Sequence, residues 1–79
     1  MNEISVQILE LYRKRDIRVG GMLLRQVLEQ PFLEDKNFKD IFNQGMIELI
    51  SEGYLEEKTQ MPFKYFLTEK GEHYLYGNP

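Results

Sequence analysis

Residues 38–75 read FKDIFNQGMIELISEGYLEEKTQMPFKYFLTEKGEHYL, and this stretch decides the fold. Its first part predicts an amphipathic helix from about Asn37 to Glu52, because apolar residues recur every three or four positions. Gly53 follows as the residue that ends the helix in the left-handed region. One side of the helix collects the residues expected in the core: Phe38, Ile41, Phe42, Gly45, Met46 and Leu49.

Gly45 is an unusual member of this apolar face, because glycine costs a helix about 1 kcal/mol relative to alanine. We therefore expect another backbone to pass close to Gly45. The opposite face of the helix is polar around a single isoleucine. It carries Asn37, Asp40, Asn43, Gln44, Ile47, Glu48 and Ser51.

Two short strands are predicted after this helix, over residues 54–59 and 64–67. They are joined around the segment Gln60-Met61-Pro62-Phe63 and therefore form a hairpin. Alternation along the second strand separates its residues into two faces. Tyr65 and Leu67 share one face, and Lys64 and Phe66 share the other.

Three further helices complete the predicted fold. The first begins after Asn2, a good N-cap residue. The second runs from about Met22 to Gln30 and is stopped by Pro31, whose ring lacks an N–H and disfavours helix in the preceding residue. The last begins after Thr68, which is again an N-cap residue type.

The composition indicates one small globular domain. The chain has 79 residues, of which 42% are hydrophobic, no cysteine, and a net charge of −3. It is too apolar to be disordered, and the missing cysteine excludes a disulfide framework or a thiolate metal site. No apolar run approaches the roughly 20 residues that span a bilayer, and the N-terminus does not look like a signal peptide. We therefore expect a soluble, cytoplasmic protein.

Two motifs resemble those of winged helix-turn-helix repressors of the MarR-like and PadR-like kind. They are LISEGYL at residues 49–55 and YFLTEKG at residues 65–71. In these proteins a helix ends in Gly-Tyr-Leu/Ile, a wing follows, and a Leu-Thr-x-x-Gly element opens the closing helix. The resemblance implies an α+β fold in which residues 1–79 form a single winged-helix domain. Such a domain has a three-helix core, a two- to three-stranded wing hairpin and a C-terminal helix.

The resemblance also implies a function, that of a small DNA-binding transcriptional regulator acting as a dimer. The helix over residues 37–52 would be the recognition helix, entering the major groove by its N-terminal part. Asn and Gln can contact adenine edges, and Lys can contact phosphates. The expected contacts with double-stranded DNA are Lys36, Asn37, Lys39, Asn43 and Gln44 in this helix, with Lys58 and Lys64 in the wing.

Charge and wing composition support an alternative without DNA binding. From Lys36 to Glu52 the chain has two lysines, three acidic residues and no arginine. The predicted wing tip is apolar, and an apolar projection rimmed by charge marks interaction sites. The alternative is therefore a protein–protein interaction module. Its expected partner contacts are Ile47, Met61 and Phe63.

Two further surfaces are candidates for binding, one for DNA and one for a second copy of the chain. The arginines gather in the first half of the chain, at residues 13–18 and at Arg25, and a third hypothesis places DNA on that surface. A homodimer is expected to use the first and last helices. The residues expected in that contact are Val6, Tyr74 and Tyr76.

Catalysis has little support in this sequence. His73 is the single histidine, and Glu69 and Glu72 are its acidic neighbours. Those residue types are ordinary on a helix surface, so we expect no metal site and no cofactor. Without a cysteine or a second histidine, no nucleophile with its base and orienting group is indicated. We expect that the protein is not an enzyme.

Overall fold

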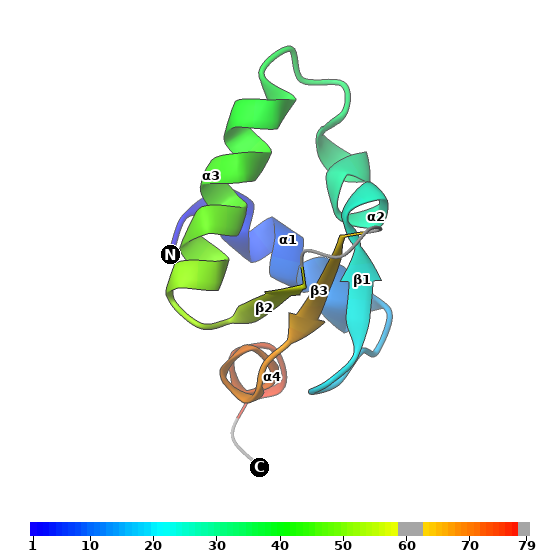
Figure 1. Ribbon diagram of the computed structural model, residues 1–79, viewed down its shortest axis with the longest axis vertical. Helices are drawn as coiled ribbons and strands as arrows, with labels where there is room; N and C mark the ends of the chain where they lie inside the picture. The colour runs from blue at the N-terminus through cyan, green and yellow to red at the C-terminus, as the bar shows by residue number, and fades with distance from the viewer. Residues whose placement is uncertain (59–62, 78–79) are drawn as a thin grey trace.

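The computed structural model describes residues 1–58 and 63–77. Its architecture is α+β, with a three-stranded antiparallel sheet in the order β1-β3-β2 (Figure 1). The elements follow one another as α1 (Glu3–Lys14), β1 (Met22–Leu24), α2 (Arg25–Glu29), the 3-10 helix η1 (Gln30–Phe32), α3 (Phe38–Ser51), β2 (Leu55–Lys58), β3 (Lys64–Leu67) and α4 (Glu69–Tyr76).

The segment from Met22 to Gln30 differs from its prediction as one helix. Residues 22–24 form β1, which pairs with β3 and places Leu23 opposite Tyr65, and α2 begins only at Arg25. Local periodicity did not reveal β1, because its backbone partners lie on a strand far along the chain. The α-helix does end before Pro31, although the chain continues through this proline as η1.

The other predicted elements are confirmed with small changes at their ends. The third helix, α3, is one residue shorter at each end than predicted, and Gly53 after it has a left-handed φ of 82°. Strand β2 is shorter than the predicted 54–59, and β3 covers the predicted 64–67. The expected N-caps both form: the side chain of Asn2 accepts a hydrogen bond from the amide of Ile4, and that of Thr68 accepts one from Gly71.

Helix α1 crosses α3 at Gly45. A Cβ placed on Gly45 would lie 2.9 Å from Ile4 Cγ2, 3.1 Å from Ile8 Cδ1 and 3.4 Å from the Ser5 amide nitrogen. The Ser5 hydroxyl, fully buried, donates a hydrogen bond to the Gly45 carbonyl at 3.1 Å. The expected close approach is therefore real, and the side chains of α1, more than its backbone, fill the space that glycine leaves.

Tyr12 fastens α1 to the centre of the sheet. Its ring is fully buried and its hydroxyl donates a hydrogen bond to the Tyr65 carbonyl at 2.8 Å. Burial raises the pKa of Tyr12, so the phenol stays protonated and keeps donating. The core around it draws on every element of the fold except α4: Ile8, Leu9, Leu11, Leu23, Leu28, Phe32, Phe42, Met46, Leu49, Leu55, Tyr65 and Leu67.

Helix α4 packs at the end of the sheet near the C-terminus (Figure 1). The Thr68 hydroxyl lies 2.6 Å from the Gly53 carbonyl oxygen and 2.9 Å from that of Tyr54, both in the turn that follows α3. At the other end of the helix, the Tyr76 hydroxyl donates to the Ile17 carbonyl at 2.7 Å. The start and the end of α4 are thus tied to other parts of the domain. Within residues 1–58 and 63–77, no helix has the length and apolar character needed to cross a membrane.

Candidate functional site

The outward face of α3 carries the side chains predicted to contact DNA. Lys39, Asn43 and Gln44 are exposed on the helix, and Lys36 and Asn37 are exposed just before it. The Asn37 side chain makes no capping hydrogen bond. The backbone amide of Asn37 donates to the Asp35 carboxylate at 2.8 Å. The opposite side of the same helix is buried at Phe42, Met46 and Leu49. Five candidate side chains therefore reach solvent around the N-terminal half of α3.

Two predicted wing lysines lie directly opposite each other. Lys58 on β2 pairs with Lys64 on β3, so both side chains project from the same face of the hairpin. Like charges opposite each other on a sheet are destabilising. Lys58 has a partial compensation in Glu56, 3.5 Å away, and its ammonium lies 5.9 Å from the centre of the Phe66 ring. The pair therefore places two positive charges on one face of the hairpin, with an acidic residue beside one of them.

A groove of about 420 Å³ separates α3 from the sheet. Its apolar part comes from α3, where Ile47 is 67% exposed beside the buried Met46. Its polar part comes from α3 itself and from α2, β2 and β3. The residues lining it are Arg25, Asn43, Met46, Ile47, Ile50, Ser51, Glu57 and Tyr65.

Arg25 is the residue of this groove that sequence analysis assigned to the wrong surface. It stands at the start of α2, and its guanidinium crosses to α3, where Nη2 donates to Asn43 Oδ1 at 3.0 Å. It also donates weakly to the Tyr65 hydroxyl and to Glu29, each at 3.4 Å, and it lies 5.1 Å from the centre of the Phe42 ring. Arg25 therefore belongs to the α3 face, by contacts that only the folded chain creates.

The Tyr65 phenol lies beside both charged residues of the groove, Arg25 and Glu57. Burial raises the pKa of Tyr65, and the neighbouring Arg25 guanidinium acts in the opposite direction. Glu57 on β2 pairs with Tyr65 across the sheet and lines the same groove. A row of polar groups thus runs from Asn43 through Arg25 and Tyr65 to Glu57, beside the apolar residues of α3.

The residues predicted for a protein partner have different surroundings. Ile47 is exposed as expected. Phe63 is half-buried and packs against the core, and its carbonyl accepts a hydrogen bond from the Arg25 amide at 3.4 Å. Met61 lies outside the described residues. Part of the Phe63 side chain is therefore buried in the domain, which leaves less of it available for contact with a protein partner.

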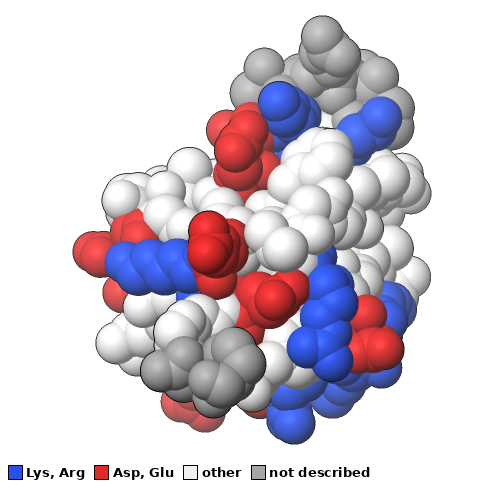
Figure 2. All heavy atoms as spheres, turned by 90° about the horizontal axis from the view of Figure 1, so that it is seen from below, with Lys and Arg blue, Asp and Glu red and all other residues white. Residues whose placement is uncertain are grey.

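Two of the four basic residues at 13–18 have acidic neighbours. Arg13 pairs with Glu10 within α1, and Arg18 lies 3.2 Å from Asp16. The Arg18 guanidinium also stacks 3.7 Å above the centre of the Tyr76 ring. Figure 2, which views the molecule from the side of α4, shows acidic and basic side chains next to one another on this face. On the hairpin, Lys58 likewise has an acidic neighbour in Glu56.

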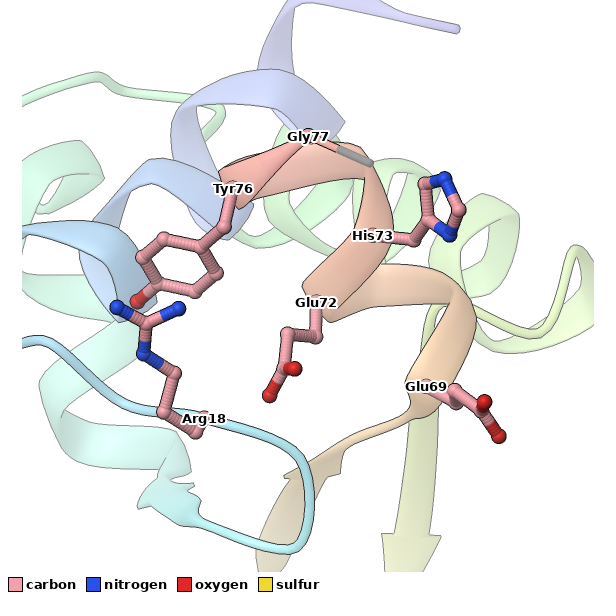
Figure 3. A pocket seen from close by; sticks show the side chains of 6 residues that line it. All are labelled: Arg18, Glu69, Glu72, His73, Tyr76 and Gly77. Atoms are coloured by element: carbon pink, nitrogen blue, oxygen red, sulfur yellow. The ribbon is translucent and has the colours of Figure 1, made fainter. Parts of the chain in front are cut away.

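A smaller hollow of about 260 Å³ lies between α4 and the loop before β1 (Figure 3). Arg18, Glu72 and Tyr76 face it together, and the Glu72 carboxylate accepts a hydrogen bond from the Val19 amide. Glu69, His73 and Gly77, all on or just after α4, complete its lining. In the described ranges, no group of three or more His, Cys, Asp or Glu side chains is placed to hold a metal ion.

No protein family, no curated protein and no solved structure matches this chain. A function for this chain must therefore follow from the arrangement and chemistry of its own residues.

Proposed function

We propose that the chain is a winged-helix domain that binds double-stranded DNA, with α3 as the recognition helix and β2–β3 as the wing. The observation that carries this proposal is the two-sided character of α3. One side holds the core together, and the other presents amides and lysines to solvent at the end that would enter a major groove. The order of the elements, with a hairpin and a closing helix after α3, supports the same fold.

The distribution of charge along α3 favours contact through its N-terminal half. From Lys36 to Gln44 there are two lysines and one acidic residue, Asp40. The acidic residue Glu48 lies in the last turn and Glu52 is the C-cap, both beyond the part of a recognition helix that reaches base edges. Although the whole chain has a net charge of −3, residues 36–44 therefore have a net charge of +1, which suits contact with phosphates.

The wing lysines supply the second contact in this proposal. Lys58 and Lys64 repel each other in the free protein, and a phosphate beside them would relieve that repulsion. Helix and hairpin contacts of this kind position a protein on the duplex without reading its sequence. The sequence-reading role then falls to the amides Asn43 and Gln44.

A dimer would double this small contact. One acidic domain with a few lysines binds DNA weakly, since phosphate neutralisation supplies the non-specific affinity. We propose Val6 of α1 and Tyr74 of α4 as contact residues. Val6 is half-buried, and Tyr74 is 45% exposed with its ring packed edge-on against Tyr54. Tyr76, the third expected residue, uses its hydroxyl inside the domain.

A salt titration tests DNA binding directly. Affinity for a random-sequence duplex is measured by fluorescence anisotropy at salt concentrations from about 50 mM to about 200 mM. The logarithm of the association constant should fall linearly with the logarithm of the salt concentration. The double variant Lys36→Glu/Lys39→Glu should bind more weakly and lose about two units of the salt slope. No binding of the wild type at low salt would remove the proposal.

The double variant Lys14→Glu/Arg15→Glu is the matched control. It makes the same change of net charge at the exposed end of α1, away from α3. It should retain most of the wild-type affinity. A loss confined to this control would instead assign DNA binding to the basic residues at 13–18.

A protein partner is the second candidate function, favoured by the exposure of Ile47 on the rim of the 420 Å³ groove. The variant Ile47→Arg separates the two. A positive charge on α3 should maintain or raise affinity for random-sequence DNA. The same charge in the centre of an apolar interface should abolish docking of a protein. The partner for this test would be identified by co-purification and then titrated as a purified protein.

A further inference from the structure

Arg25 and Asn43 form one unit on the DNA-facing side of α3. The guanidinium is held from four directions, by Asn43, by the phenol of Tyr65, by Glu29 and by the face of the Phe42 ring. Its bond to Asn43 Oδ1, at 3.0 Å, is the shortest of its three hydrogen bonds. Both side chains line the groove beside Ile47, and Asn43 is exposed.

This contact fixes which way round the Asn43 amide faces. A guanidinium carries only N–H donors, so it pairs with the amide oxygen and repels the amide NH₂ group. An asparagine in solvent can turn its amide over and offer either end. With Oδ1 directed to Arg25, Asn43 presents its two N–H donors away from the guanidinium.

The fixed amide changes which base edge suits Asn43. A bidentate contact with adenine needs Oδ1 to accept from the N6 amino group while Nδ2 donates to N7. The N6 amino group would have to approach an oxygen that already lies beside a positive charge. Guanine offers two acceptors in the major groove, N7 and O6, and these suit the two N–H donors that Asn43 presents.

We propose that the Arg25–Asn43 pair selects guanine where an isolated asparagine would select adenine, with Arg25 acting as the residue that positions Asn43. This inference rests on the proposed function, because it names the base that the α3 face reads. It also gives α2 a role in recognition, through the side chain of Arg25 alone.

The test is selection from a random-sequence duplex pool, with sequencing of the bound fraction. Wild-type protein should enrich guanine at one position of the site. Arg25→Met removes the guanidinium and frees the amide, so the preferred base at that position should change to adenine. Competition with single-base variants of the selected duplex should show a reversal of about tenfold in relative affinity.

A second variant keeps the test valid if Arg25→Met fails to fold. Asn43→Asp retains the contact with Arg25 as an ion pair and replaces the donors with acceptors, so guanine preference at the position should disappear while the domain stays folded. Circular dichroism of each variant checks the fold.

The outcomes separate this inference from the proposed function. A wild-type protein that enriches nothing and binds no duplex contradicts DNA binding itself, and the inference with it. Wild-type enrichment of adenine at the position, or guanine preference that survives both Arg25→Met and Asn43→Asp, overturns the inference and leaves DNA binding intact.

Discussion

The two faces of α3 obey different physical rules. On the inner face, Phe42 and Leu49 are fully buried, and Gly45 is enclosed by α1. On the outer face, Ile47 is 67% exposed and Gln44 is also exposed. Volume decides which residues the inner face accepts, whereas charge and hydrogen-bonding chemistry decide what the outer face can do. Substitutions on one helix can therefore separate stability from function.

The largest difference between the faces should appear when an apolar side chain is shortened on each. Phe42→Ala leaves a cavity under α3 and should lower the free energy of unfolding by about 3–5 kcal/mol. Ile47→Ala, one and a half turns away, should change it by less than about 0.5 kcal/mol. Chemical denaturation followed by circular dichroism measures both. Equal losses for the two variants would contradict the assignment of the faces.

A smaller difference should follow from placing an alanine on each face. Gly45→Ala gains about 1 kcal/mol of helix propensity. Its Cβ meets Ile4 and Ile8 at 2.9 and 3.1 Å, and overpacking of this kind costs about 1–3 kcal/mol. We therefore expect a net loss of stability. The neighbouring substitution Gln44→Ala shares the helix but lacks the clash, and it should be nearly neutral. A stabilised Gly45→Ala would show that α1 moves aside at little cost.

The smallest effect is expected at Glu48, on the border between the faces. The nearby Ser5 hydroxyl and the Asn2 backbone amide, whose nitrogen lies 2.8 Å from Oε1, hold the pKa of Glu48 below its ordinary value of 4.5. The lowered pKa means that the carboxylate contributes stability above pH 4.5 and loses it as the pH falls through the folded-state value. Glu48→Gln should therefore flatten the acid limb of the stability curve. Parallel acid limbs for the two proteins would exclude this contribution.

Most of the α+β fold could be predicted from local patterns in the sequence. The periodicity of α3, the Gly53 ending and the Thr68 cap depend on residues close together in the chain, and each was found. Strand β1 was not found, because its hydrogen bonds go to β3 and not to its neighbours. A short apolar segment such as 22–24 suits a helix or a strand equally well until a partner is known.

The candidate site was predictable to a smaller extent. Exposure of Asn43, Gln44 and Ile47 followed from the helical wheel. The Arg25–Asn43 contact could not be predicted in this way. It joins side chains of two different helices, and periodicity within one helix does not show which residues of another helix lie nearby. Sequence order also grouped Arg25 with the residues at 13–18, whereas in the structure its hydrogen bonds lead to α2, α3 and the sheet.

The capping of α4 has a consequence for the order in which the molecule assembles and opens. An isolated eight-residue helix is unstable in water, since nucleation is costly. The hydroxyl that caps α4 lies within hydrogen-bonding distance of carbonyls in the turn after α3, and Lys70 donates to the Glu52 carbonyl from the same helix. Helix α4 thus becomes stable only after α3 and the hairpin are in place. During hydrogen–deuterium exchange its amides should be the earliest to lose protection, ahead of those in α1 and α3.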